Sequence, residues 1–303
     1  MPEPQNSKNR FAGIILIIIS AAAFGTLGIL GRYAYAEGLD TLSIMALRFL
    51  LSALVLLAML ALRGEALPRG RNLVRLIGMG AVGYVGQAFA YLTALKYASP
   101  GLVALLLYLY PVFVVILSVI WNHEPINRIK IFALGVALIG LALTVGPAGG
   151  QLPGILLAIC AAAIYSVYII VGTKVMQEVS AIQSSTVIFF SAGVTSSLLM
   201  FANGAHLPKT GTGWAVIAAI VLIATVIPVV TFLAGLRRIG ATNAAMLSTL
   251  EPVVTVLLAA LLLGEILKPV TLVGGGLILA AVIILMRTEL RGPANERVDG
   301  GHS

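Results

Sequence analysis

The sequence has 303 residues, of which 60% are hydrophobic and only 10% are charged. So few charged side chains cannot cover the surface of a soluble protein of this size, which excludes a soluble globular fold. The net charge of +8 does not indicate a nucleic-acid partner, because the basic residues gather at the ends of apolar segments.

The apolar residues form ten blocks, each long enough to cross a hydrocarbon core of about 30 Å as a helix. We therefore predict an all-α integral membrane fold with polar tails at residues 1–10 and 287–303. The first block continues to Leu30, which is too long for the apolar region of a cleaved signal peptide. The ten predicted spans are residues 11–31, 41–62, 73–95, 100–121, 128–146, 153–173, 183–202, 213–235, 242–263 and 269–286.

The distribution of basic residues predicts how the chain is oriented. Arg48 lies inside a span, and only four more of the 19 Lys and Arg residues fall on one predicted side of the membrane, namely Arg32, Lys96, Lys209 and Lys268. The other side, which includes both tails, holds the rest. Because cytoplasmic loops are enriched in Lys and Arg, we expect both termini in the cytoplasm and the chain in a bacterial inner membrane.

The second half of the sequence repeats the first at a shift of 141 residues (252 − 111). Matches between leucine-rich helices are common by chance, but matched glycine, proline and glutamate residues in one register are not. These matches are Pro111 with Pro252, Glu124 with Glu265, and Gly135 with Gly276. The shift predicts two repeats of five spans each, over residues 11–146 and 152–286.

An odd number of spans in each repeat implies that the second repeat enters the membrane from the opposite side. Inverted-topology repeats are typical of secondary transporters, whose substrate site lies near the bilayer midplane between the repeats. The alternative is an old duplication that is retained only for stability.

The ninth predicted span contains an unusual polar stripe. Ser248, Glu251 and Thr255 follow at spacings of three and four, so they share one helical face. A carboxylate near the bilayer centre costs about 2.5–3.5 kcal/mol on insertion scales. Protonation of Glu251, pairing with Arg48, or contact with the ammonium group of a substrate offsets this cost. The alternative is a structural hydrogen bond from Glu251 to a neighbouring helix.

Two prolines and two glutamates occupy matched positions. Pro252 is expected to kink the ninth helix and to free the carbonyl of Ser248, and Pro111 to kink the fourth. Such kinks either flex during alternating access or fit the packing. Glu124 and Glu265 lie at helix ends on opposite membrane faces, where they either brace neighbouring helix ends or serve as gate elements.

The shift of 141 aligns Glu251 with Tyr110 in the sequence. Tyr110 is therefore expected to face the same cavity from the other half. Tyr108 lies about 200° round the helix and is expected to point elsewhere. Aromatic rings suit apolar and aromatic substrates and attract an ammonium group. The remaining predicted cavity residues are Tyr84, Gln87 and Tyr91 in the third span, Thr225 and Phe232 in the eighth, Tyr165 and Tyr168 in the sixth, and Phe24 in the first.

Three stretches resemble the EamA-type transporters of the drug/metabolite transporter superfamily. They are ALRFLLSALVLL, ALKYASPGLVALLLYLYPVFVVILSVIWNHEP and GLRRIGATNAAMLSTLEPVVTVLLAALLLGEILKPVTLVGGGLILAAVII. The resemblance implies a ten-helix transporter of amino acids, other metabolites or drugs, and it is greatest to the amino-acid exporters, including the aromatic amino acid exporter type. The family pattern Leu-Gly-Glu at 263–265 is Asn-His-Glu at 122–124, which departs from it.

Several features are absent from the sequence. It has no phosphate-binding loop for ATP, no cluster of metal ligands and no catalytic pair within the spans, so we expect neither a cofactor nor an enzyme. No cluster of basic residues within the spans is available to hold a phosphate. The prediction is a secondary transporter that exports amino acids, in contact with lipid and small-molecule substrate. The alternative is a multidrug or metabolite exporter that is proton-coupled through Glu251. The sequence does not specify an oligomeric state.

Overall fold

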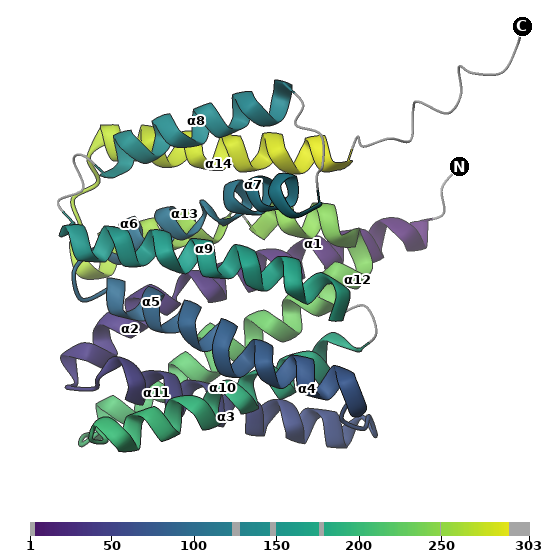
Figure 1. The fold of residues 1–303 in the computed structure, drawn as a ribbon, viewed down its shortest axis with the longest axis vertical. Coiled ribbons are helices and arrows are strands. Elements are labelled where there is room, and N and C mark those ends of the chain that lie inside the picture. The colour runs from purple at the N-terminus through teal and green to yellow at the C-terminus, as the bar shows by residue number, and fades with distance from the viewer. Residues whose placement is uncertain (1–3, 123–127, 146–149, 176–178, 249, 291–303) are drawn as a thin grey trace, which may run out of the picture.

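The computed structural model describes residues 4–122, 128–145, 150–175, 179–248 and 250–290, which contain helices and no strands (Figure 1). The first half holds α1 (Pro4–Gly25), α2 (Leu27–Ala36), α3 (Thr41–Leu62), α4 (Gly70–Gly78), the π-helical segment η1 (Met79–Tyr84), α5 (Val85–Ala94), α6 (Pro100–Leu107), α7 (Tyr110–Asn122) and α8 (Arg128–Val145). The second half holds α9 (Leu152–Val175), α10 (Ala181–Asn203), α11 (Gly211–Val221), the π-helical segment η2 (Leu222–Val226), α12 (Ile227–Ser248), α13 (Leu250–Leu263) and α14 (Pro269–Leu290).

Six helical segments of the described chain are long and apolar enough to cross a membrane. They are Phe11–Ala36, Thr41–Leu62, Gly70–Ala94, Leu152–Gly172, Ala181–Asn203 and Gly211–Leu236. The other four predicted spans correspond to shorter apolar helices, Pro100–Val114, Ile131–Leu143, Leu250–Leu263 and Pro269–Ile284. The all-helical membrane fold is therefore confirmed, and the number of ten spans remains a prediction.

The fourth predicted span is broken rather than kinked. The break separates α6 from α7 at Tyr108 and Leu109. In the ninth predicted span, α12 ends at Ser248 and α13 begins at Leu250, and Thr249 lies outside the described residues. Pro111 is the second residue of α7, and Pro252 is the third residue of α13. The first-turn amides of a helix have no partner within it, so proline is tolerated there. The kink expected at Pro111 is therefore wrong, because a new helix segment begins beside this proline instead of a continuous helix bending there. The kink expected at Pro252 remains a prediction.

The loop expected between the eighth and ninth spans is also absent, because α12 continues through it to Ser248. In the first half, Ser99 caps α6 by accepting a 3.3 Å hydrogen bond from the amide of Leu102, and Pro100 follows as its first residue. The shift of 141 places Ala241 at the position of Pro100. Without a proline, nothing at this position stops the α12 hydrogen-bond ladder.

Helix packing relates the two halves of the molecule. Helix α3 packs along α10, α8 along α14, α1 along α12, and α5 along α9 (Figure 1). Under the shift, α3 corresponds to α10 and α8 to α14, while the α1–α12 pair exchanges with the α9–α5 pair. Equivalent helices of the two halves therefore make equivalent contacts.

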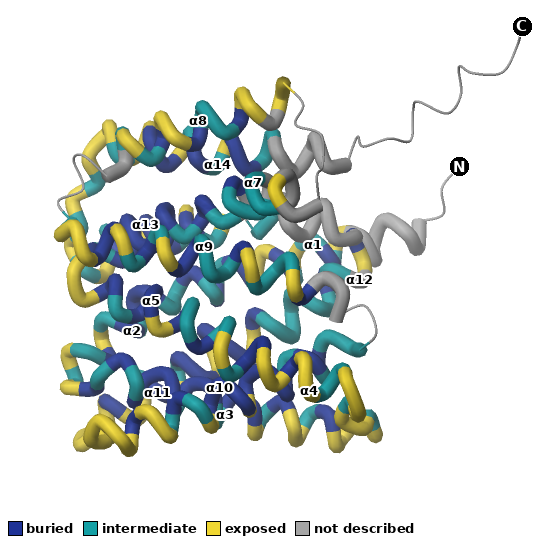
Figure 2. Tube along the Cα trace, viewed as in Figure 1, coloured by how far each residue is buried: buried dark blue, intermediate teal, exposed yellow. Residues whose placement is uncertain are grey.

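Many large apolar side chains of the bundle are exposed. The exposed residues lie mainly along outer helix faces and at helix ends (Figure 2). Phe201 and Leu261 are 70% and 79% exposed, whereas Phe49 at the centre is fully buried. Exposure of so large an apolar surface to water is unfavourable, whereas lipid hydrocarbon accommodates it. The burial pattern therefore fits a helix bundle surrounded by lipid.

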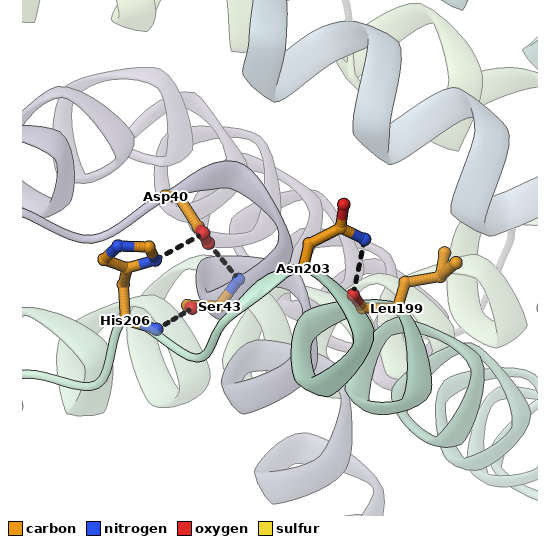
Figure 3. Close-up of polar contacts among 5 residues, drawn as sticks. All are labelled: Asp40, Ser43, Leu199, Asn203 and His206. Atoms are coloured by element: carbon orange, nitrogen blue, oxygen red, sulfur yellow. Dashed lines mark hydrogen bonds and ion pairs between the residues drawn. The ribbon is translucent and has the colours of Figure 1, made fainter.

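Polar contacts from neighbouring loops hold both ends of the α3–α10 pair. At one end, Asp40 caps α3 by accepting a 2.7 Å bond from the amide of Ser43, and its other oxygen lies 2.9 Å from Nδ1 of His206 (Figure 3). At the opposite end, the hydroxyl of Ser180, which caps α10, donates a 3.0 Å bond to Glu65. Each link joins the N-cap of one helix to the loop that follows the other.

Replacing Asp40 with asparagine is expected to lower stability by about 1 kcal/mol or less at neutral pH, because asparagine also caps helices but carries no charge. Burial raises the pKa of the Asp40 carboxyl, but hydrogen bonds from Ser43 and His206 outweigh it and hold that pKa below the ordinary 3.8. A depressed carboxyl pKa stabilises the fold above the ordinary value and loses this contribution as pH falls through the folded-state value. Thermal unfolding in detergent should therefore show the two proteins converging between about pH 5 and about pH 2. A constant difference across that range contradicts the role of the charge.

Candidate functional site

Polar and aromatic side chains from both halves meet where the α6–α7 break, α13 and the π-helical segments approach one another. We call this group the central cluster. It comprises Arg48 of α3, Tyr84 of η1, Tyr108 at the α6–α7 break, Tyr110 of α7, Tyr165 and Tyr168 of α9, Thr225 of η2 and Glu251 of α13.

Arg48 is the basic member of the cluster and is only 4% exposed. Its Nε donates a 2.9 Å hydrogen bond to the Thr225 hydroxyl, and Tyr84 is a second hydrogen-bond partner. The guanidinium carbon lies 5.1 Å from the centre of the Phe49 ring. These contacts offset the cost of burying the charge and direct the side chain into the bundle.

The two π-helical segments hold the partners of Arg48. The side-chain hydroxyl of Thr225 donates a 2.8 Å bond to the carbonyl of Ile220, five residues earlier. The backbone bonds of a π-helix have the same spacing. Tyr84 and Thr225 are related by the shift (225 − 84 = 141), so both halves place a π-helical residue at the centre. π-bulges occur frequently at functional sites.

Glu251 of α13 meets Tyr108, which lies at the α6–α7 break. The hydroxyl oxygen of Tyr108 lies 3.1 Å from Oε2 of Glu251 and 2.5 Å from the carbonyl oxygen of Ser248. Pro252 lacks the amide that would bond this carbonyl within a continuous helix, which leaves the oxygen available to Tyr108. Tyr108 is 4% exposed, so these contacts lie well inside the molecule.

The expectation that Tyr108 points away from the site is therefore wrong. It assumed regular helical rotation from Tyr108 to Tyr110, but α6 ends at Leu107 and α7 begins at Tyr110. At the break the backbone leaves the helical path, and both tyrosines reach the cluster, with ring centres 5.8 Å apart. Pro111, three residues after Tyr108, was the sequence signal for this break.

A chain of aromatic rings connects the acidic and basic members of the cluster. From Tyr110, the ring centres follow at 4.9 Å to Tyr165, 6.0 Å to Tyr168 and 5.7 Å to Tyr84. These separations are those of favourable edge-to-face and offset stacked pairs. The chain thus begins beside Tyr108 and Glu251 and ends at the partner of Arg48.

Arg48 and Glu251 are near enough for their charges to act on each other. Among the described residues, however, they form no ion pair within 4.0 Å, and Arg48 bonds Thr225 instead. The possible pairing of Arg48 with Glu251 is therefore not seen in this arrangement. Opposite charges occupy the same cluster without direct contact.

Sequence comparison identifies the family to which this fold and cluster belong. The model of the EamA-like transporter family matches residues 11–146 and, a second time, residues 152–287. The chain belongs to the EamA-like transporter family. It is accordingly a multi-pass membrane transporter.

Similar proteins agree with this assignment. A transporter of Archaeoglobus fulgidus is 29% identical over 281 residues, which is 91% of this chain and 96% of that protein. The transporter YcbK of Bacillus subtilis is 24% identical over 90% of this chain and 92% of its own. The inner membrane transporter YedA of Escherichia coli K12 is 27% identical over 85% of each chain. Their descriptions name no substrate.

A solved crystal structure shares the fold of this EamA-like transporter. Its TM-score is 0.66 at 23% identity, and the match covers 92% of this chain and 98% of the other. At this identity the likeness shows the fold alone.

Some predicted site residues of this EamA-like transporter lie near the cluster without joining its ring chain. Tyr91 is 6% exposed and lies near enough to act electrostatically on Arg48 and Glu251. Gln87, on α5, is half-buried. Thr255 donates a 2.9 Å bond to the carbonyl of Gly25, the last residue of α1, which is a structural contact.

Other predicted residues lie elsewhere. Phe232 packs against Ile17 and Ile239, in a small cluster between α1 and α12. Phe24 is half-buried on α1, and within the described part of the chain it forms no ring pair with the tyrosines. The shift related Phe24 to Tyr165 and Phe232 to Tyr91, but equivalent positions do not converge where the halves differ in conformation.

Of the two matched glutamates, Glu124 lies outside the described residues. Glu265 lies in the loop that follows α13. Burial raises the pKa of its carboxyl, and hydrogen bonds from the Ser99 side chain and the Gly101 amide oppose that rise. Its carboxylate therefore braces the N-terminus of α6, where the helix dipole favours negative charge.

Proposed function

We propose that this EamA-like transporter exports amino acids across the bacterial inner membrane, with the central cluster as its substrate site. The observation that carries the proposal is the presence of a buried arginine and a half-buried carboxylate in one cluster that aromatic rings connect. A free amino acid offers the complementary groups, namely a carboxylate, an ammonium group and a side chain.

Each group of the ligand has a partner of suitable chemistry. Arg48 uses Nε for Thr225, and a guanidinium has further N–H donors that suit a carboxylate. Glu251 and the tyrosine rings attract an ammonium group. The rings also provide an apolar surface for the side chain of a neutral or aromatic amino acid.

Differences between the halves support an amphipathic ligand. The shift of 141 relates an aromatic residue to each polar member of the cluster: Phe189 to Arg48, Tyr84 to Thr225, and Tyr110 to Glu251. The Phe189 and Tyr84 rings lie 5.5 Å apart, at the position where the other half places the Arg48–Thr225 hydrogen bond. The site is therefore polar on one side and aromatic on the other.

The fold supports transport by alternating access. Equivalent helices of the two halves make equivalent contacts, and the two π-helical segments lie at nearly matched positions. With residues 11–146 and 152–286 as inverted repeats and both termini in the cytoplasm, the axis lies in the membrane plane. A movement that closes the site on one side then opens it on the other.

A second candidate is the export of cationic drugs or metabolites. It is favoured by the carboxylate of Glu251, which forms no ion pair with Arg48 in the described structure and lies near several aromatic rings. A flat organic cation needs a carboxylate and rings but no arginine.

Reconstitution in proteoliposomes separates these functions. Uptake of a panel of labelled amino acids should exceed uptake into protein-free liposomes, with phenylalanine and leucine among the transported compounds. Equal rates for every amino acid with and without the protein contradict the proposal. Movement of an aromatic cationic dye in that case supports the second candidate.

Replacing Tyr165 with leucine is expected to weaken transport of aromatic amino acids selectively. Tyr165 contacts both Tyr110 and Tyr168, and aromatic pairing contributes about 0.5–1.5 kcal/mol beyond burial, so KM for phenylalanine should rise about 2–12-fold. KM for alanine, which offers no ring, should change less. Tyr33→Leu, at a 39% exposed position on α2, is the control. An equal rise for both substrates argues that Tyr165 only supports the fold.

A further inference from the structure

We propose that Tyr108 and Glu251 form a proton-operated latch between the α6–α7 break of the fourth predicted span and the ninth predicted span, so that the proton is a ligand of the site. When Glu251 is protonated, it donates to Tyr108, and Tyr108 donates to the carbonyl of Ser248. When Glu251 is ionised, Tyr108 donates to the carboxylate, and its bond to the Ser248 carbonyl is lost. The inference rests on the proposed transport function for its consequence, but the exchange can be measured without substrate.

The geometry follows from counting donors. The hydroxyl oxygen of Tyr108 lies 2.5 Å from the Ser248 carbonyl oxygen and 3.1 Å from Glu251 Oε2. A phenol has one O–H hydrogen, and both a carbonyl and a carboxylate can only accept. A protonated carboxyl is the one form of Glu251 that allows two full hydrogen bonds here, since it can donate to the phenol oxygen.

Ionisation of Glu251 changes which acceptor receives the Tyr108 hydroxyl hydrogen. A carboxylate is a stronger acceptor than a neutral carbonyl, because hydrogen bonds to charged groups contribute about 1.5–3 kcal/mol against about 1 kcal/mol for neutral pairs. The single Tyr108 hydrogen therefore turns to Glu251 when the proton leaves. The proton itself passes to water, and no bond other than O–H is made or broken.

The charged and titratable groups around Glu251 are compatible with both states. Helix α1 brings a backbone contact rather than a charge, since a Cβ at Gly25 would lie 2.9 Å from the Glu251 carbonyl oxygen. On α2, Arg32 acts on Glu265. The groups that act on Glu251 or are acted on by it are Arg48 from α3, Tyr84 from η1, Tyr91 from α5, Tyr108 at the break, Tyr110 from α7 and Tyr165 from α9. Arg48 is the positive charge in this set, so it favours ionisation and allows the proton to leave.

The position of the latch determines which helices it connects. Tyr108 lies at the α6–α7 break of the first half, whereas Ser248 ends α12 and Glu251 is the second residue of α13 in the second half. In the protonated state, Tyr108 therefore bonds both α12 and α13. Loss of the Ser248 bond releases α12 from Tyr108 while α13 remains attached, which couples proton release to the contact between the two halves.

Infrared spectroscopy of the purified protein tests the latch directly. Difference spectra between acidic and alkaline pH should contain the carbonyl band of a protonated carboxyl group that Glu251→Gln removes. Tyr108→Phe should shift the frequency of this band, because the acceptor of the carboxyl hydrogen is gone. Tyr35→Phe is the matched control, since its hydroxyl donates a 2.7 Å bond to the carbonyl of Leu92 away from the cluster. A band that survives Glu251→Gln, or that Tyr108→Phe leaves unshifted, overturns the proposal.

Hydrogen exchange of the wild-type protein provides a test that needs no variant. After correction for the intrinsic effect of pH, amides at the C-terminal end of α12 should exchange about fivefold faster when Glu251 is ionised, because one hydrogen bond is lost. Glu251→Gln can donate to Tyr108 as the protonated acid does, so its exchange should remain slow at every pH. Exchange that is equal at both pH values in the wild type contradicts the latch. Failure of amino-acid transport with these results intact removes the proposed substrate and leaves the latch.

Discussion

Replacing Arg48 with leucine is expected to raise KM for a zwitterionic amino acid at least about 100-fold. A guanidinium can give a carboxylate two charge-assisted hydrogen bonds, and each contributes about 1.5–3 kcal/mol. The fold should tolerate the change, because leucine removes a buried charge together with its desolvation cost. Arg48→Lys should be intermediate, since lysine keeps the charge and loses the planar pair of donors.

Comparison of two substrates identifies the group that Arg48 recognises. Proteoliposome uptake of phenylalanine should fall sharply in Arg48→Leu, whereas uptake of phenethylamine, which lacks the carboxylate, should change little. Arg63→Leu, at an exposed position just after α3, serves as the control for loss of one positive charge. If Arg48→Leu is folded and transports phenylalanine with an unchanged KM, Arg48 does not bind the substrate carboxylate.

Replacing Gly80 with alanine is expected to destabilise the protein by about 1–3 kcal/mol, whereas Gly78→Ala should be neutral or slightly stabilising. A Cβ at Gly80 would overlap the carbonyl oxygen of Ile188 and the side chain of Ser191, and would lie 2.9 Å from the Cα of Ile188. Ile188 belongs to α10, so this backbone cannot move away without displacing the helix. A Cβ at Gly78 meets nothing within 4 Å.

The glycine pair also tests whether the π-helical segment positions the site. Gly80 lies in η1, which ends at Tyr84, so separation of η1 from α10 should move the Tyr84 ring away from Phe189. Thermal unfolding in detergent measures the stability, and phenylalanine uptake measures the effect on the site. Equal unfolding temperatures for the two variants indicate that α10 adjusts to the added methyl group. If a destabilised Gly80→Ala protein still transports phenylalanine normally, the packing of η1 against α10 contributes to stability but does not position the site.

The class of fold and the main polar residues could be predicted from the sequence. Because a backbone in lipid must satisfy its own hydrogen bonds, long apolar segments predict helices, and charged residues within them stand out. This is why Arg48, Glu251 and the tyrosines of α7 and α9 were identified without coordinates. The matched prolines were also detectable, because proline is rare enough for its position to carry information.

The local backbone could not be predicted in the same way. The residues of η1 and η2 have the same apolar composition as the α-helical residues around them, so neither π-helical segment has a sequence signal. The proline positions indicated irregularity, but the choice between a kink and a break depends on neighbouring helices. The error at Tyr108 and the separate location of Phe232 both arose from extending one helical rotation through residues where it does not hold.

Composition and residue order are enough to establish that this protein is a helical membrane protein with a doubled pattern and a few costly polar residues within its spans. These properties follow from the types and order of side chains, which lipid constrains segment by segment. Packing between helices, in contrast, sets the Arg48 bond to Thr225 rather than Glu251, and the contacts of Tyr108 with Ser248 and Glu251. Such pairings depend on how the helices break and cross, and that geometry results from packing between segments distant in the chain.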